Sequence, residues 1–130
     1  MADTMQFDLV SPERSLVSTQ ATAVRIPGSD GDMTAMKDHA PVVTTLRPGI
    51  LTVEAEGGAQ EFAVFGGFAQ VGADGTTVLA EEALPKGELT AEFVEERVAK
   101  AEAARNAAEG AGVDAAAKRV ADLQAMRDAL

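Results

Sequence analysis

The sequence predicts a mainly β fold with a helical end: an antiparallel β-sandwich of short strands, followed by a C-terminal α-helical hairpin. Three observations predict it. From Met5 to about Ala83, apolar and polar residues alternate in short runs separated by turn signals. No helical run separates these strands, which is typical of antiparallel sandwiches. After "LPKGEL" the pattern changes to alanine and charged residues at helical spacing.

The strand pattern is clearest in two runs. "MQFDLVS" places Met5, Phe7 and Leu9 on one face and polar residues between them, and "GILTVEAE" alternates in the same way. Each run is therefore expected to bury one face. The dipeptides Gly57-Gly58 and Asp74-Gly75 lie between such runs and suit tight hairpin turns that require a positive φ.

The C-terminal third predicts two helices. Thr90 is a suitable N-cap for a helix over about 90–109, and Asp114 for a second over about 114–129. The division is then a sandwich domain at 1–85, a linker at 86–89 and a hairpin at 90–130. The apolar stripes expected to face each other are Val94, Val98, Ala101, Ala104 and Ala108 on the first helix, and Ala116, Val120, Leu123, Met126 and Leu130 on the second. Alanine buries little area, so the hairpin is a candidate moving part.

Composition excludes several classes of function. The 130 residues include 21 acidic and 11 basic ones, a formal net charge of −10. This charge argues against binding to nucleic acid or to a bare anionic membrane. Cysteine is absent, and no stretch approaches the length of an apolar membrane span. A soluble intracellular protein is expected.

The stretch "GSDGDMTAMKDHAP" gathers three aspartates and the only histidine. Counted from Asp30, a calcium loop would need Gly at its sixth position and Glu at its twelfth, where this chain has Ala35 and Pro41. His39 has no second histidine or cysteine to share a zinc ion, and no nucleophile elbow is present. The sequence therefore predicts no catalytic site, no metal site and no cofactor.

The order of motifs resembles a known family. "GSDGD", "DHAP", "LRPG" and "TVLA" follow one another at the spacing found in the epsilon subunit of F-type ATP synthases, which corresponds to the mitochondrial delta subunit, and an alanine-rich helical hairpin follows. The resemblance covers nearly the whole chain. It implies a sandwich of about ten strands and a helical hairpin, with no active site of its own.

The resemblance also implies a place and a role. Members of the family sit in the rotating central stalk between the gamma subunit and the c-ring, and they couple proton flow to ATP synthesis. This chain would then be a peripheral protein at the cytoplasmic face of the bacterial inner (plasma) membrane, held there through the complex. The residues expected to dock on the c-ring, at one end of the sandwich, are Ser29, Asp30, Gly31, Asp32, His39, Ala40 and Pro41. Those expected to pack on gamma are Phe65, Gly66, Gly67 and Phe68.

In many bacteria the hairpin of such subunits blocks ATP hydrolysis, and the resemblance leaves open whether it does so here. The residues that would contact the beta subunit are Arg97, Lys118, Arg119 and Arg127. Nucleotide-binding members have an Asp where this chain has Val94, which argues against ATP sensing. A second interpretation also stays open, a free-standing sandwich that binds nucleotide or metal and signals through its hairpin. Binding to gamma or to a c-ring distinguishes the two.

Overall fold

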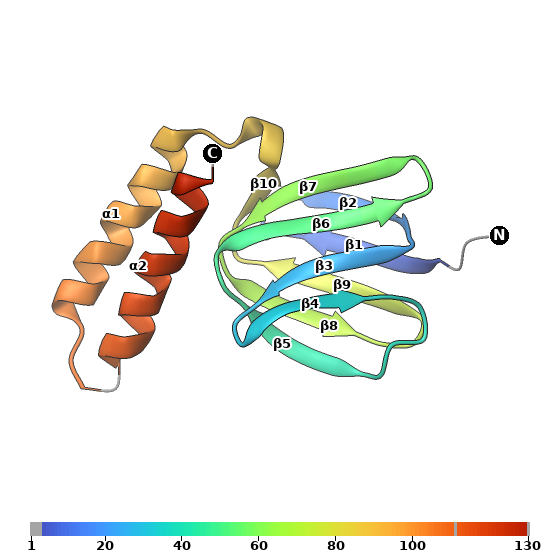
Figure 1. Cartoon of the computed structure of the whole chain (residues 1–130), viewed down its shortest axis with the longest axis horizontal. Helices are drawn as coiled ribbons and strands as arrows, with labels where there is room; N and C mark the ends of the chain where they lie inside the picture. Colours follow the sequence, from blue (N-terminus) through green and yellow to red (C-terminus); the bar gives the residue numbers. More distant parts are fainter. Residues whose placement is uncertain (1–3, 111, 130) are drawn as a thin grey trace. The chain divides into compact units, whose positions relative to one another are not determined.

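The computed structural model describes residues 4–110 and 112–129 (Figure 1). The chain forms two compact units, the first ending at Lys86 and the second beginning at Gly87. The first unit is a ten-stranded sandwich and the second holds two helices, so the predicted fold class is confirmed. Within the described residues, no helix is long and apolar enough to cross a membrane.

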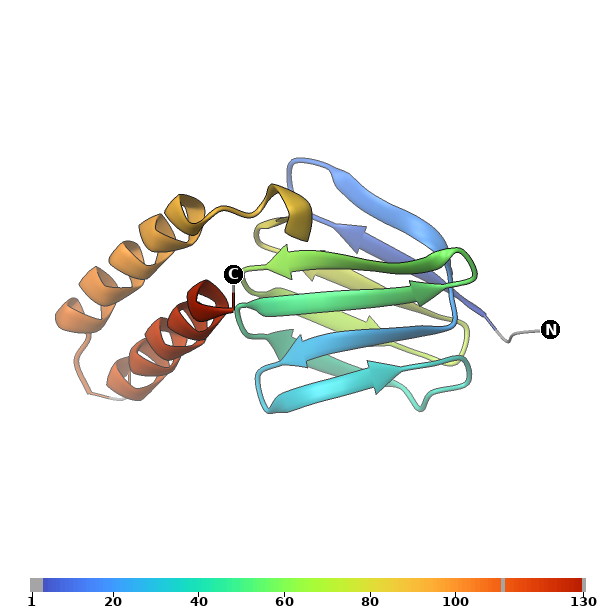
Figure 2. The same cartoon turned by 45° about the horizontal axis from the view of Figure 1, so that its top comes forward.

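The strands of the first unit lie in two layers (Figures 1 and 2). One layer holds β10, β7, β6, β3 and β4, and the other holds β5, β8, β9, β1 and β2. The two layers join where Gly28 of β3 pairs with Leu46 of β5. The strands are β1 (Met5–Val10), β2 (Ser15–Ala21), β3 (Ala23–Gly28), β4 (Gly31–Ala35), β5 (Val42–Leu46), β6 (Gly49–Ala55), β7 (Gly58–Val64), β8 (Gly67–Val71), β9 (Gly75–Ala80) and β10 (Ala83–Pro85).

One strand pair departs from the antiparallel prediction. β1 and β9 run parallel, whereas the other pairs among the described strands are antiparallel. The separation of the two strands in the sequence explains this exception. β1 and β9 are far apart in the chain, so no hairpin turn joins them or forces opposite directions. Alternation within each strand carries no information about such a long-range pairing.

The core lies between the two layers. The predicted inward residues Met5, Phe7 and Leu9 are buried, and so are Leu51 and Val53 of β6. Alternation along the strands therefore identified the buried face correctly at these positions. Other members of the core include Val24, Ile26, Leu46, Phe62, Val64, Val71 and Val78.

The turns at Gly57-Gly58 and Asp74-Gly75 need glycine for different reasons. Gly58 has the expected positive φ, at 125°. Gly75 does not adopt a positive φ. A Cβ at this position would lie 2.9 Å from the backbone oxygen of Gln6. Glycine is needed at position 75 because neighbouring β1 approaches closely, not because the turn is left-handed.

The second unit begins with the short 3-10 helix η1 (Lys86–Glu88), followed by α1 (Ala91–Ala107) and α2 (Gly112–Asp128). Thr90 caps α1 as predicted, its hydroxyl accepting a hydrogen bond of 3.1 Å from the Phe93 N–H. Asp114 is not the N-cap of α2, because the helix has already begun at Gly112. Asp114 lies instead in the first turn of α2, where the helix dipole still stabilises a carboxylate.

The apolar seam of the hairpin is shorter than predicted. Its buried residues are Val94, Val98 and Ala101 on α1, and Val120, Leu123 and Met126 on α2. Ala104 is exposed, while Ala108 and Ala116 are half-buried. Leu130, the last residue of the predicted stripe, lies outside the described residues. Small alanine side chains toward the loop therefore leave that half of the hairpin with little apolar packing.

Candidate functional site

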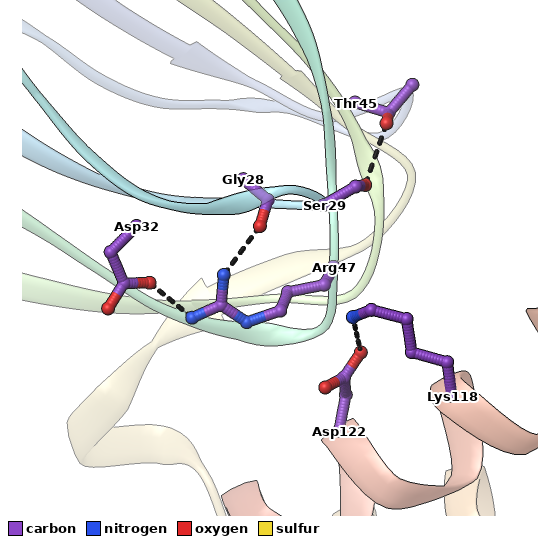
Figure 3. Close-up of polar contacts among 7 residues, drawn as sticks. All are labelled: Gly28, Ser29, Asp32, Thr45, Arg47, Lys118 and Asp122. Carbon is purple, nitrogen blue, oxygen red and sulfur yellow. Dashed lines mark hydrogen bonds and ion pairs between the residues drawn. The ribbon is translucent and has the colours of Figure 1, made fainter.

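The acidic turn is a tight hairpin between β3 and β4 (Figure 3). Gly28 pairs with Gly31, so Ser29 and Asp30 form its two-residue loop. The Ser29 N–H donates to the Thr45 carbonyl at 2.9 Å, and the Thr45 hydroxyl donates to the Ser29 hydroxyl at 2.7 Å. The turn is therefore fastened to β5 as well as to its own two strands.

Arg47, at the start of the connection between β5 and β6, also contacts the acidic turn. Its guanidinium donates to the Gly28 carbonyl at 2.5 Å and forms an ion pair with Asp32 (Figure 3). Its backbone N–H donates to the Pro27 carbonyl at 3.0 Å. Asp30, by contrast, is exposed and forms no hydrogen bond or ion pair among the residues that the structure describes. The two aspartates of the turn therefore have different environments.

The "DHAP" loop lies at the other end of β4. The Asp38 N–H donates to the Ala73 carbonyl at 3.0 Å, which fixes the loop against the turn between β8 and β9. His39 Nδ1 lies 2.7 Å from the Ala40 carbonyl oxygen. Pro41 is exposed.

The prediction that this loop and the acidic turn share one end of the sandwich is therefore wrong. β4 is an extended strand, and five residues of strand separate the two motifs by roughly 15 Å. Because β4 pairs with β3 alone among the described strands, the two motifs instead flank one edge strand.

The stretch predicted to pack on gamma contributes mainly one exposed side chain. Phe65 is 1% exposed and lies in the core, and Gly66 and Gly67 are also buried. Phe68 is 55% exposed. Phe68 is therefore the member of this stretch whose side chain is available to a partner.

Phe68 belongs to an apolar row that the sequence reading missed. On the outer face of its layer, Phe68 lies opposite Leu79, and Leu79 lies beside Val10 of β1. Leu79 is also 55% exposed. Thr45, which holds the acidic turn, lies opposite Phe68 on β5. The apolar row, defined as Val10, Phe68 and Leu79, is therefore continuous with the acidic turn.

The charged residues that line the hollow beside the acidic turn are already paired. Within residues 4–110 and 112–129, no three His, Asp or Glu side chains lie close enough to hold a metal ion. A shallow hollow of about 250 Å³ opens beside Asp32 and is lined by Arg25 and Glu61. Those two charges already pair with neighbours, Arg25 with Glu54 at 3.4 Å and Glu61 with Lys86 at 3.6 Å.

Three of the four basic residues predicted to contact the beta subunit form ion pairs within the hairpin. Arg127 of α2 pairs with Glu95 of α1 at 2.9 Å, and this hydrogen bond raises the pKa of the Arg127 guanidinium. Lys118 pairs with Asp122 at 2.8 Å (Figure 3). Arg97 lies over the Phe93 ring, 3.6 Å from its centre.

Arg119 forms no ion pair with the described residues and is half-buried. Among the four predicted inhibitory contacts, it is the one whose charge is uncompensated within the hairpin. Val94, at the position where the resemblance implies an Asp in nucleotide-binding members, is fully buried in the seam. A carboxylate at that position is thus replaced by a packing side chain.

Comparison with known proteins finds similarity along nearly the whole chain. Residues 4–86 match the family described as "ATP synthase, Delta/Epsilon chain, beta-sandwich domain". The ATP synthase epsilon chain of Rhodobacter capsulatus is 56% identical over 126 residues, covering 97% of this chain and 96% of the relative. That of Ruegeria sp. (strain TM1040) is 55% identical with the same coverage of both chains.

Two solved structures share the fold. A chain of the Euglena gracilis mitochondrial ATP synthase structure (OSCP/F1/c-ring) aligns with a TM-score of 0.74 and 24% identity, covering 99% of this chain and 82% of that one. A chain of the Tetrahymena thermophila mitochondrial ATP synthase central stalk/c-ring structure aligns with a TM-score of 0.65 and 10% identity, covering 98% and 96%. At these identities the likeness concerns the fold.

Proposed function

The chain belongs to the family of ATP synthase delta/epsilon chains, as its motifs predicted, and from this we propose that it is a non-catalytic central-stalk subunit linking gamma to the c-ring. In that position it couples proton flow to ATP synthesis. The observation that carries the proposal is the 56% identity to an ATP synthase epsilon chain over 97% of the sequence. The complex holds the chain at the cytoplasmic face of the bacterial plasma membrane.

The apolar row is the proposed attachment to gamma. Phe68 and Leu79 are each more than half exposed, although they stand on a rigid, paired sheet. Burying such side chains against a partner contributes about 1 kcal/mol or more each. Phe65, Gly66 and Gly67 are buried and present no side chain to a partner there.

The acidic turn is the proposed attachment to the c-ring. A carboxylate at the tip of a tight turn suits the polar, basic loops of such a ring, and charged contacts of this kind mainly set orientation. His39, Ala40 and Pro41 lie at the far end of β4. Both ends of β4 can touch one ring surface only if this edge strand lies along the ring.

For the hairpin we infer a regulatory role in ATP hydrolysis that does not depend on ATP sensing. Its seam is short, so separating or refolding the two helices costs little compared with unfolding the sandwich. The basic charge of Arg119, which forms no ion pair with the described residues, is then available to the beta subunit. Buried Val94 leaves no carboxylate for a nucleotide at the family's motif position.

Reconstitution tests the proposal. The purified chain is added to a catalytic head that lacks it and to membranes that hold the c-ring. We expect it to bind gamma, to join the c-ring and to restore proton-driven ATP synthesis. Failure to bind either partner would overturn the proposal. A melting temperature that rises with ATP, Mg²⁺ or Ca²⁺ in a chain that binds neither partner would support the ligand-sensing alternative.

A chain shortened to residues 1–89 tests the role of the hairpin. The sandwich and its attachments should persist, because the core and both proposed docking surfaces lie in the first unit. ATP hydrolysis by the reconstituted complex should rise when the hairpin is removed. Unchanged hydrolysis would refute the regulatory role and leave the stalk role standing.

A further inference from the structure

The proposed docking of the acidic turn leaves a question about its two aspartates. Asp30 and Asp32 lie two residues apart and carry the same charge, so sequence alone treats them as equivalent. Their surroundings differ. Asp32 forms an ion pair with Arg47, whereas Asp30 stands at the tip of the loop with no such partner among the described residues.

Arg47 is the better covered partner of this pair. Its side chain is 25% exposed, compared with 77% for Asp32. If Asp32 turned outward to meet a basic partner, the largely covered guanidinium would lose its counter-charge. The ion pair therefore keeps Asp32 turned toward Arg47, although a pair with one exposed partner contributes little to stability.

Arg47 also acts on the backbone of the turn. One of its guanidinium nitrogens donates to the Gly28 carbonyl while another meets Asp32, so a single side chain spans both strands of the hairpin. The planar guanidinium offers several donors in fixed directions, and lysine cannot reproduce this double contact. The Thr45 hydroxyl holds Ser29 from the other side.

We propose that Arg47 is a positioning residue that fixes the acidic turn so that Asp30, and not Asp32, presents its carboxylate to the basic c-ring. This inference rests on the proposed function of the turn. In it, Asp32 serves as the counter-charge of Arg47. Preorganising Asp30 avoids the entropy cost of ordering a flexible loop at the moment of docking.

A merely structural role for Arg47 makes a different prediction. If Arg47 only stabilised the fold, its removal would lower the melting temperature without altering how attachment depends on salt or on Asp30. A positioning role instead couples the two residues. The effect of removing the Asp30 charge should then shrink once Arg47 is gone, which a double-mutant cycle measures directly.

The experiment titrates the complex of the full chain with gamma onto c-rings in neutral-lipid nanodiscs. The dissociation constant is measured at several KCl concentrations between about 50 and 300 mM, across which surface charges become progressively screened. The variants are Asp30→Asn, Asp32→Asn, Arg47→Ala, Arg47→Lys and the double variant Asp30→Asn/Arg47→Ala. Arg25→Ala is the matched control, because Arg25 also pairs with a carboxylate, Glu54, and its loss changes the net charge equally.

Asp30→Asn should weaken attachment by about fivefold at low salt and flatten its salt dependence. Arg47→Ala should weaken attachment by a similar factor, Arg47→Lys by less, and the double variant by little more than either single one. Asp32→Asn should weaken attachment less than Asp30→Asn and leave the salt dependence in place. Arg25→Ala should change nothing.

The outcomes separate this inference from the function on which it rests. If Asp32→Asn flattens the salt dependence as much as Asp30→Asn does, Asp32 meets the ring directly and the inference is wrong. It also fails if Asp30→Asn weakens attachment while Arg47→Ala does not, or if the two changes simply add. If neither Asp30→Asn nor Asp32→Asn alters attachment, the c-ring role of the turn itself falls.

Discussion

The sandwich and the helical hairpin differ in how many apolar side chains they bury. The sandwich buries a continuous core between two layers, drawn from nearly all of its strands. Among the described residues of the hairpin, each helix buries three side chains, and one of these six is an alanine. Two 17-residue helices with so little apolar seam are marginal by themselves, whereas a two-layer core fixes one structure. The proposed docking surfaces therefore stand on the rigid unit, and the proposed regulation depends on the loose one.

The largest effect should come from the core of the sandwich. Phe7→Ala removes a fully buried ring between the layers and should lower the free energy of unfolding by about 3–5 kcal/mol. Chemical denaturation of Phe7→Ala and of the unchanged chain measures this loss. Phe68→Ala is the matched control, because this phenylalanine is half exposed and its loss should cost less than about 0.5 kcal/mol. Equal losses would break the distinction between core and docking face.

The next effect should be confined to the hairpin. Leu123→Ala empties a fully buried site on α2 and should remove about 2–5 kcal/mol from the packing of the two helices. Hydrogen exchange should then become fast throughout α1 and α2. Amides of the sandwich should keep their protection. If the sandwich amides also lost protection, the two units would unfold as one and the contrast between them would fail.

Much of the sandwich was predictable because strand alternation is a local signal. Met5, Phe7 and Leu9 fell on the buried face for that reason. The same rule could not separate Phe65 from Phe68, because Phe65 lies in the connection between β7 and β8, where Gly66 and Gly67 have positive φ. Strand alternation does not continue through such a connection, and the structure is needed to show that Phe65 is buried and Phe68 exposed.

The Arg47 contacts and the apolar row were beyond the sequence reading. Arg47 meets Gly28 and Asp32 only because β3 and β5 join the two layers, and Leu79 meets Val10 only through the parallel pairing of β1 with β9. Both depend on pairing between strands distant in the chain. Local periodicity predicts on which face of the sheet a residue lies. It does not predict which residues of other strands lie beside it on that face.

A third prediction concerns the docking face of the rigid unit. Phe68→Ala should weaken binding to gamma by about tenfold, which corresponds to about 1.4 kcal/mol, because exposed aromatic side chains commonly anchor interfaces. Calorimetric titration of gamma measures it. Gln60→Ala is the control, an exposed residue on β7 of the other layer, and should bind as tightly as the unchanged chain. Equal weakening by both variants would mean that the apolar row is not the gamma surface.

The smallest effect should come from the ion pair across the hairpin. Arg127→Ala removes the contact with Glu95 and should speed hydrogen exchange near Glu95 and Arg127 by less than Leu123→Ala does. Lys100→Ala, which also removes one positive charge from the hairpin, should have no such effect.

The pH dependence of the ion pair between Arg127 and Glu95 tests whether Arg127 governs the stability of the hairpin. Its hydrogen bond with Glu95 raises the pKa of Arg127 in the folded state. A group whose pKa is raised by folding contributes fully at every pH below its unfolded value, and loses that contribution only as the pH rises through the folded one. For arginine both values lie well above neutrality. The difference in protection between the unchanged chain and Arg127→Ala, measured relative to the intrinsic exchange rate of each amide at the same pH, should therefore be the same at pH 6 and pH 9. A difference that varied across this range would show that a group other than Arg127 governs the stability of the hairpin.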